Sequence, residues 1–302
     1  MLHFTVDLFI PSDSLPTMDW VPLLFFDDVC HQLRKPTFWQ VSQLSGNWSK
    51  FGSEHGEKRI ELKFRCRVSY QEVSYGFWET GCSREVTVED LNLEFDRITS
   101  FACGSAFPND TCVNRVSLRE FERVVQPTVA PLVANCWWWY LDAQRSDQNR
   151  FFFNAFKNCP GFNEIHVQEH GQESREFIAR QVQLGNIRKL NLYGTDRWPK
   201  AENLAEMLKI FVSSTRFHKL VSPDPLPNDY KLFELFLERA LANELKPGAY
   251  INTFAGNLET SRLLSLHPEC HDDLEKDTWR IPDSNLRIAL RHYSGMLCVS
   301  VK

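Results

Sequence analysis

The sequence has 302 residues, and 34 lysines and arginines against 39 aspartates and glutamates give a formal net charge of −5 and a pI near 6.0. A hydrophobic content of 43% with 24% charged residues is typical of a globular chain of about one to two domains and excludes a disordered one. The mild acidity gives no general attraction to phosphate. Because the sequence shows no local basic stripe either, we expect no nucleic-acid partner.

The N-terminal residues do not resemble a secretory signal, because they carry Asp7 and lack both a cationic start and a long apolar run. The longest apolar stretch, residues 131–141, is interrupted by Asn135 and is shorter than the roughly 20 residues of a membrane span. The nine cysteines are an odd number and lie mostly in apolar or strand-like patterns, as reduced core thiols do. We therefore expect an intracellular protein, cytoplasmic or nuclear, without a membrane segment.

Residues 1–17 contain prolines and small polar residues that break any periodicity, and we expect a flexible extension there. Residues 18–52 then show two segments of helical periodicity, separated by Pro36, with Gly46 and Gly52 at the weak end of the second segment. The apolar positions that carry this periodicity are Phe26, Val29, Cys30, Leu33, Phe38, Val41, Leu44 and Trp48. The spacing predicts a small helical hairpin.

Residues 53–145 are expected to form a β-rich region. From residue 60 to residue 70 the apolar period is two, which predicts a half-buried strand, and further strand-like runs cover 73–78 and 85–95. The region ends in three adjacent tryptophans, residues 137–139, which cannot all point into one core. We interpret them as a crossing between two cores, with an aromatic hot spot for a partner as the alternative, and place a domain boundary near residue 145.

Helical and strand patterns alternate in residues 146–302, which is typical of stacked αβ units with parallel strands. Strand starts near residues 163, 187, 217 and 249 have a spacing close to the roughly 20 to 29 residues of a leucine-rich repeat. Alternation over 286–290 and 297–301 predicts a C-terminal β-hairpin that caps the repeat sheet. The predicted fold is thus mixed α+β and α/β, with a helical start, a β-rich middle and leucine-rich-repeat-like αβ units.

The sharpest catalytic pattern is formed by His166, Glu169 and His170, whose order matches the H-x-x-E-H of inverted zinc peptidases. That motif needs both histidines one turn apart on a helix, whereas this segment continues a strand pattern. Residues four apart on a strand lie about 13 Å from each other, which is too far to share one zinc ion. A zinc hydrolase is therefore kept only as a disfavoured alternative.

A second set of residues could offer metal ligands, but the sequence has no Cys-x-x-Cys motif or second ligand pair to complete a zinc site. We interpret this set as a surface turn. Its members are His267, Cys270, His271 and Asp272. The sequence contains no nucleophile elbow, phosphate loop or dinucleotide fingerprint. We accordingly expect no catalytic residue, no cofactor and no metal ligand.

Residues 18–29, MDWVPLLFFDDV, resemble the opening of a large nematode-specific family of F-box-like proteins, in which an M-D-x-V-P entry precedes a Phe-rich helix. Residues 190–194, LNLYG, together with residues 198–200, WPK, are similar to the L-x-L-Y-G-x-W-P segment of that family. The C-terminal hairpin around residues 291–301 is similar as well. The resemblance covers nearly the whole chain from Met18, although only these three stretches are specific.

The resemblance implies a short helical module that docks on a Skp-family adaptor of a cullin-RING ubiquitin ligase, followed by a domain that holds the substrate. It places the adaptor contacts at Pro22, Phe26, Val29, Leu33, Leu44 and Trp48. The chain departs from the module in two respects. Lys35-Pro36 shortens the linker, and no clear third helix is expected before Ile60.

Stacked αβ units expose one face of their strands, so the residues between the apolar positions of one strand are expected to contact a partner. These residues are Arg188, Lys189, Asn191 and Tyr193. The sequence thus predicts a non-enzymatic protein-interaction protein that serves as a substrate receptor of a ubiquitin ligase. The alternative is a degenerate F-box-like family member that acts as a protein-binding scaffold without ligase association.

Overall fold

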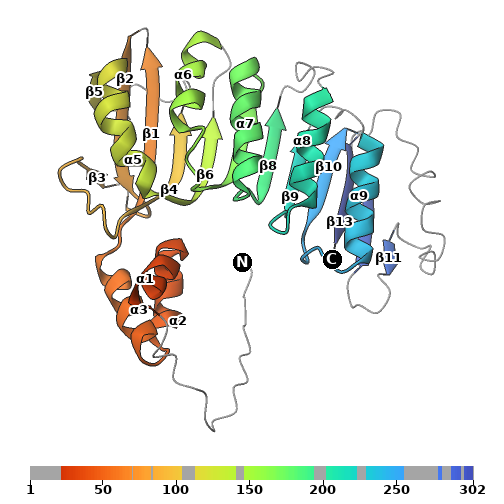
Figure 1. Cartoon of the computed structure of the whole chain (residues 1–302), viewed down its shortest axis with the longest axis horizontal. Coiled ribbons are helices and arrows are strands. Elements are labelled where there is room, and N and C mark those ends of the chain that lie inside the picture. Colours follow the sequence, from red (N-terminus) through yellow and green to blue (C-terminus); the bar gives the residue numbers. More distant parts are fainter. Residues whose placement is uncertain are drawn as a thin grey trace. The chain divides into compact units, whose positions relative to one another are not determined.

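The structure is a computed structural model (Figure 1). It describes residues 22–69, 71–82, 84–103, 113–140, 146–193, 202–222, 229–254, 278–280, 287–293 and 296–301. The chain divides into two compact units, Met1–Glu57 and Lys58–Lys302, which we call the helical unit and the sheet unit. The expected extension over 1–17, the WPK part of the family-like segment and the cluster at 267–272 lie outside the described residues.

The described part of the helical unit, residues 22–57, contains three α-helices rather than the predicted hairpin. Its elements are α1 (Leu23–Gln32), the short 3₁₀ helix η2 (Lys35–Thr37), α2 (Phe38–Ser42) and α3 (Asn47–Lys58). The second predicted segment is divided because Gly46 has a φ of 64°, in the left-handed region that ends a helix. Gly52 is not at a weak end but in the middle of α3, where a Cβ would lie 2.8 Å from the backbone nitrogen of Ser42. Glycine is therefore needed for close packing of α3 on α2.

The sheet unit is built on one thirteen-stranded sheet in the order β11-β12-β13-β10-β9-β8-β7-β6-β4-β1-β2-β3, with β5 also paired to β2. Strands β1, β4, β6, β7, β8, β9 and β10 are parallel to one another, and the strands that flank them pair antiparallel. The strands are β1 (Glu61–Ser69), β2 (Glu72–Glu79), β3 (Glu85–Val86), β4 (Arg97–Cys103), β5 (Asn114–Ser117), β6 (Val133–Tyr140), β7 (Phe162–Gln168), β8 (Lys189–Tyr193), β9 (Lys219–Ser222), β10 (Tyr250–Phe254), β11 (Thr278–Arg280), β12 (Arg287–Tyr293) and β13 (Met296–Val301).

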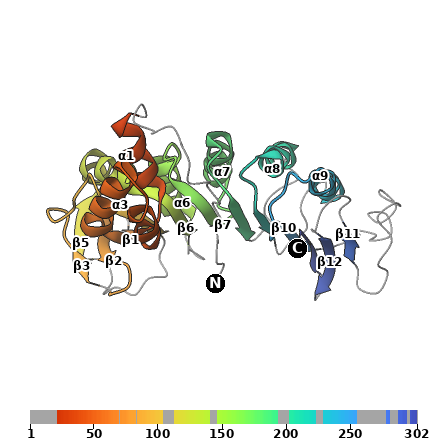
Figure 2. The same cartoon turned by 90° about the horizontal axis from the view of Figure 1, so that it is seen from below.

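The helices that the structure describes in this unit lie on one face of the sheet (Figures 1 and 2). They are α4 (Leu118–Glu120), the π-helical turn η4 (Phe121–Val125), α5 (Gln126–Leu132), α6 (Ser146–Phe156), α7 (Gln172–Leu184), α8 (Glu202–Ser213) and α9 (Asp229–Leu241). One continuous core of buried side chains runs between helices and sheet from Leu62 to Val301. The mixed αβ class is confirmed. In chain order, each of α7, α8 and α9 connects two parallel strands that are neighbours in the sheet, as the alternating pattern predicted.

No break divides the described sheet near residue 145, so the two-core interpretation of the tryptophan triplet is wrong. Residues 137–139 lie within β6, a central strand that pairs with β4 and β7. Successive strand residues point to opposite faces. Trp138 is therefore buried under the helices, with its ring stacked 4.8 Å from that of Phe101, while Trp137 is half-buried and packs against the ring of His166. The segment before them is helix α5, in which Pro127 takes a first-turn position.

The predicted C-terminal hairpin is confirmed by the antiparallel pairing of β12 with β13. Strand β13 also pairs with β10, so the hairpin extends the parallel part of the sheet at its C-terminal end. Val299 and Val301 are buried in the core, and Cys298 and Ser300 alternate with them on the other face.

Candidate protein-interaction face

The face of the sheet opposite the described helices carries polar and aromatic side chains from many strands. Strand register aligns Trp137, Glu164, Lys189, Lys219 and Tyr250 as successive neighbours across β6, β7, β8, β9 and β10. We call this surface the open face, and its described charged and aromatic members are Lys63, Arg65, Arg67, Trp78, Arg115, Trp137, Glu61, Glu72, Glu85, Glu164, His166, Lys189, Tyr193, Lys219 and Tyr250. Each alternates with a core residue along its strand.

Glu164 is the centre of a hydrogen-bonded cluster on this face. Its Oε1 accepts a hydrogen bond of 2.8 Å from Nε2 of His166, and its Oε2 accepts one of 2.9 Å from Nζ of Lys189. The amide of Asn191 lies 2.7 Å from the same imidazole nitrogen. The His166 ring is in turn held edge-on to Trp137, at a centroid distance of 5.3 Å, and parallel to Tyr193. The cluster thus joins side chains from three neighbouring strands, β6, β7 and β8.

Burial alone would raise the pKa of the Glu164 carboxyl group. Hydrogen bonds from His166 and Lys189 and the positive charge of Lys189 outweigh that effect and lower the pKa from 4.5 to about 2. Glu164 is therefore an anion at every physiological pH. The negative charge of Glu164 offsets the positive charge of Lys189, so this part of the face is close to neutral. The face as a whole carries more cations than anions.

The open face is basic although the chain as a whole is acidic. Among the described residues its six cations, Lys63, Arg65, Arg67, Arg115, Lys189 and Lys219, outnumber its four anions, Glu61, Glu72, Glu85 and Glu164. Two of them lie over aromatic rings, since Arg65 is 5.4 Å from the Trp78 ring and Lys219 is 5.2 Å from the Tyr250 ring. Lys63, Arg65 and Arg67 share one side of β1 because successive strand residues alternate between faces. Strand pairing adds Arg115, Lys189 and Lys219 from three other strands to the same surface.

The four residues predicted to bind a partner have different environments. Tyr193 is 42% exposed and Lys189 is half-buried, but Asn191 is only 2% exposed and serves the hydrogen-bonded cluster. Arg188 is exposed and precedes β8, where its backbone nitrogen donates to the carbonyl of Asn163. Sequence reasoning missed Glu164 and His166 as part of this surface. Their alternation with Ile165 and Val167 was the signal that could have placed them there.

The structure keeps the members of the zinc-peptidase pattern apart, as the strand periodicity predicted. His166 is inside β7, whereas Glu169 follows the strand and accepts a hydrogen bond of 2.8 Å from Arg175. The Glu169 carboxylate also accepts a hydrogen bond from the backbone nitrogen of Gly171. The ring of His170 packs near that of Phe153, on the helix side of the sheet. These three side chains form no common metal site.

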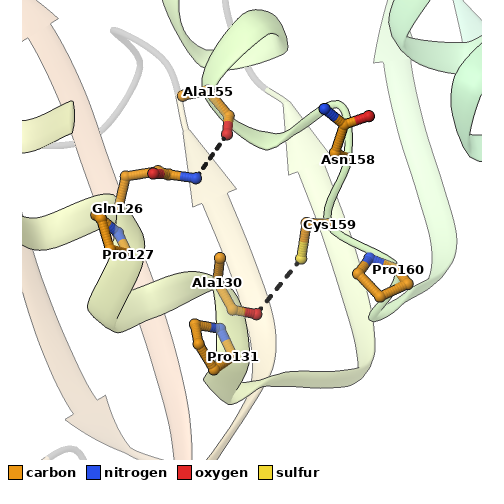
Figure 3. A pocket seen from close by; sticks show the side chains of 8 residues that line it. All are labelled: Gln126, Pro127, Ala130, Pro131, Ala155, Asn158, Cys159 and Pro160. Carbon is orange, nitrogen blue, oxygen red and sulfur yellow. Dashed lines mark hydrogen bonds between the residues drawn. The ribbon is translucent and has the colours of Figure 1, made fainter. Parts of the chain in front are cut away.

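A pocket of about 350 Å³ lies on the helix side, between α5 and the segment that follows α6 (Figure 3). No side chain that lines it carries a charge, and its lining residues are Gln126, Pro127, Ala130, Pro131, Ala155, Asn158, Cys159 and Pro160. Gln126 donates to the carbonyl of Ala155, and Cys159 to that of Ala130. Burial raises the pKa of the Cys159 thiol to about 11, so the thiol is a poor nucleophile at neutral pH. The pocket offers no acid–base pair.

The helical unit has a second surface of interest, because five of the ten exposed large apolar side chains of the described residues belong to it. These five are Leu23, Leu24, Phe25, Trp39 and Leu44. Leu24 and Trp39 are each 72% exposed. Exposed apolar side chains concentrated in a short segment are typical of an interaction surface.

The residues predicted to contact an adaptor only partly belong to this surface. Pro22 and Leu44 are exposed, and Val29, Leu33 and Trp48 are half-buried. Phe26 is 2% exposed because its ring packs against those of Trp48 and Phe51 within the helical unit itself. The structure also contains the third helix, α3, that the sequence did not indicate. Adaptor binding by these residues stays a prediction.

No protein-family model matches the chain, and comparison with the curated proteins finds no match either. Among the helices that the structure describes, none combines the length and the apolar character needed to cross a bilayer.

Proposed function

We propose that this chain is a non-enzymatic protein-interaction protein that binds an acidic segment of a protein partner on its open face. The observation that carries the proposal is the gathering of six cations and several aromatic rings on the side of the sheet opposite the described helices. Basic charge attracts an acidic partner and raises its rate of association. Aromatic side chains supply contact area at low entropic cost.

Two features favour a protein segment over a nucleic acid. Glu164 lies at the centre of the face and stays ionised, so it would repel a phosphate backbone that crosses the strands. It accepts hydrogen bonds from both His166 and Lys189, which reduces the cationic charge available there. An acidic peptide can instead place its carboxylates at the cations of β1 and β9 and leave the centre to an apolar or neutral residue.

The helical unit supports the second part of the proposal, in which the chain is a substrate receptor of a cullin-RING ubiquitin ligase. Exposed Leu23, Leu24 and Trp39 fit a helical surface that docks on a Skp-family adaptor. The burial of Phe26 inside the unit favours the alternative, a scaffold whose helices pack on themselves without ligase association. The two differ in whether an adaptor binds.

The open face is tested with a fluorescent peptide that carries glutamates and aromatic residues, and with a single-stranded oligonucleotide of the same net charge. We expect the peptide to bind the full chain in a salt-dependent way and Lys219→Glu to weaken binding by about tenfold. Lys209→Glu, on helix α8, is the matched control and should leave binding unchanged. Tighter binding of the oligonucleotide, or equal binding by both variants, would overturn the proposal.

The ligase role is tested by co-expression of the full chain with a Skp-family adaptor and size-exclusion chromatography. We expect co-elution, its loss in Leu24→Lys, and its retention in Ile210→Lys, which changes an exposed residue of α8 in the same way. Thermal melting checks that both variants are folded. Absence of co-elution for the wild-type chain would leave the scaffold alternative.

A further inference from the structure

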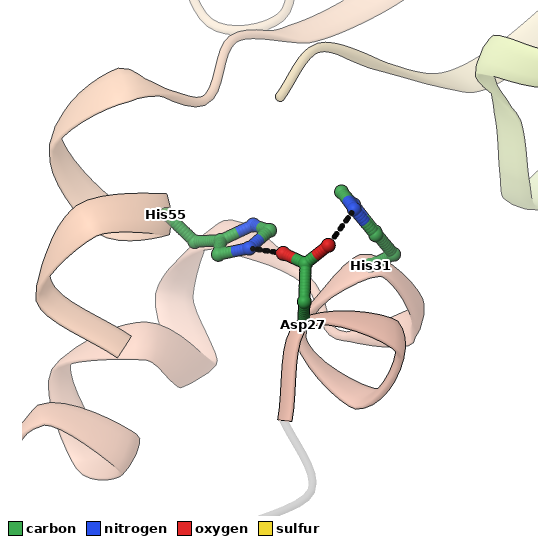
Figure 4. Close-up of side chains that lie close together, drawn as sticks. All are labelled: Asp27, His31 and His55. Carbon is green, nitrogen blue, oxygen red and sulfur yellow. Dashed lines mark hydrogen bonds and ion pairs between the residues drawn. The ribbon is translucent and has the colours of Figure 1, made fainter. Parts of the chain in front are cut away.

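A cluster of metal-binding side chains lies inside the helical unit, apart from both surfaces described above. Helix α1 supplies Asp27 and His31, and helix α3 supplies His55 (Figure 4). Asp27 and His31 are four residues apart, so they share one face of α1. His55 is fully buried, and the other two side chains are partly buried.

The three ligand atoms already face one another. Nε2 of His55 lies 2.8 Å from one carboxylate oxygen of Asp27, and Nε2 of His31 lies 3.0 Å from the other. The three atoms all lie within 4.8 Å of one another. Ligand atoms around a tetrahedral zinc ion are about 3.4 Å apart, given bonds of about 2.0 to 2.2 Å. A metal ion would therefore require the two Asp27–histidine distances to open by about half an ångström and the widest separation to close by up to about 1.4 Å.

The size of the helical unit gives an independent reason for a metal. The apolar side chains buried in residues 22–57 are Phe26, Cys30, Phe38 and Val41. Small units with so few buried apolar side chains commonly gain stability from a metal or a disulfide. Cys30, the one cysteine among residues 22–57, forms no disulfide, so a disulfide does not stabilise these residues.

We propose that Asp27, His31 and His55 form a zinc site that joins α1 to α3 and stabilises the helical unit. Two imidazoles and one carboxylate are ligands that Zn²⁺ prefers, and three protein ligands leave a fourth position for water. Zinc binds at Nε2 of each histidine, and the remaining ring proton is then carried by Nδ1. The sequence contains a signal for this site in the Asp27-x-x-x-His31 spacing. His55 could be added only from the tertiary structure.

The proposal is tested by titration of the metal-free full chain with ZnCl₂ in competition with a chromogenic chelator. We expect about one equivalent of Zn²⁺ to bind and the melting temperature to rise on binding, because the metal binds the folded state. Substitution of Co²⁺ should give the visible absorption bands of a tetrahedral site. Uptake below about a tenth of an equivalent would overturn the proposal.

Variants locate the bound ion. His31→Gln and Asp27→Asn should each lose the zinc equivalent and the zinc-dependent rise in melting temperature, and both side chains are exposed enough to be replaced without unfolding the unit. His218→Gln, a histidine substitution in the sheet unit outside the Glu164 cluster, should keep the zinc equivalent and the zinc-dependent rise in melting temperature. The double variant His267→Gln, His271→Gln tests the other group of metal-binding residues in the sequence. Loss of zinc in that variant, or its retention in His31→Gln and Asp27→Asn, would overturn the assignment.

Discussion

Replacement of Glu164 by glutamine tests the electrostatic account of the open face, because it removes one charge and keeps the shape of the side chain. The pKa of Glu164 falls from 4.5 to about 2 in the folded chain, and each pH unit between those values corresponds to about 1.4 kcal/mol. The side chain is 21% exposed, so solvent screening reduces the total. We expect Glu164→Gln to lower the free energy of unfolding at pH 7 by about 1 to 2 kcal/mol.

The pH dependence follows from the direction of the pKa change. A carboxyl group whose pKa is lowered by folding contributes stability that is fully present above its unfolded pKa, near 4.5. That stability is lost as the pH falls from about 4.5 towards 2. The difference between wild type and Glu164→Gln should therefore be constant from pH 7 to pH 5.5, fall by roughly half by pH 3, and reach zero only below about pH 2.

Urea unfolding followed by circular dichroism at pH 7, 5.5, 4 and 3 measures this difference. The matched control is Glu206→Gln on α8, because Glu206 also pairs with a lysine but is 67% exposed. An exposed pair of this kind is expected to contribute less than about 0.5 kcal/mol. Equal effects of the two substitutions at pH 7 would refute the reasoning, as would a Glu164→Gln effect that persists undiminished at pH 3.

Three further outcomes follow from burial and backbone geometry. A Cβ at Gly161 would lie 1.9 Å from a carbonyl oxygen of β6, so Gly161→Ala is expected to cost about 3 kcal/mol, seen as a melting temperature about 10 °C lower. Trp138→Ala should cost about 4 kcal/mol in urea unfolding, against less than about 0.5 for the exposed Trp39→Ala. In the native chain at pH 8, iodoacetamide should label exposed Cys82 and spare buried Cys159, as peptide mass mapping would show.

Local periodicity predicted individual elements of the fold well. The alternation over residues 60–70 corresponds to β1 (Glu61–Ser69), and the strand starts predicted near residues 163 and 249 correspond to β7 (Phe162–Gln168) and β10 (Tyr250–Phe254). These predictions succeed because a strand or helix that lies on one core must repeat its apolar residues with its own period. The same rule correctly predicted that His166 lies on a strand, and not on the helix that the zinc motif requires.

Longer-range features were not predicted correctly. The sequence suggested a boundary near residue 145, because three adjacent tryptophans resembled a crossing between cores. In the structure β6 pairs with β4 on one side and β7 on the other, so the chain on both sides of that point shares one sheet. Strand partners depend on pairing between segments far apart in the sequence, and a single sequence carries no local sign of it.

The sequence by itself determined the mixed αβ class, the alternation of helices and parallel strands after residue 146, and the C-terminal hairpin, because these depend on local periodicity and turns. Tertiary structure alone decided the two features that carry the proposals. Parallel register placed cations of β1, β8 and β9 on one open face. Packing of α3 on α1 placed His55 beside Asp27 and His31. Both depend on distances between residues remote in the chain, which only the folded backbone sets.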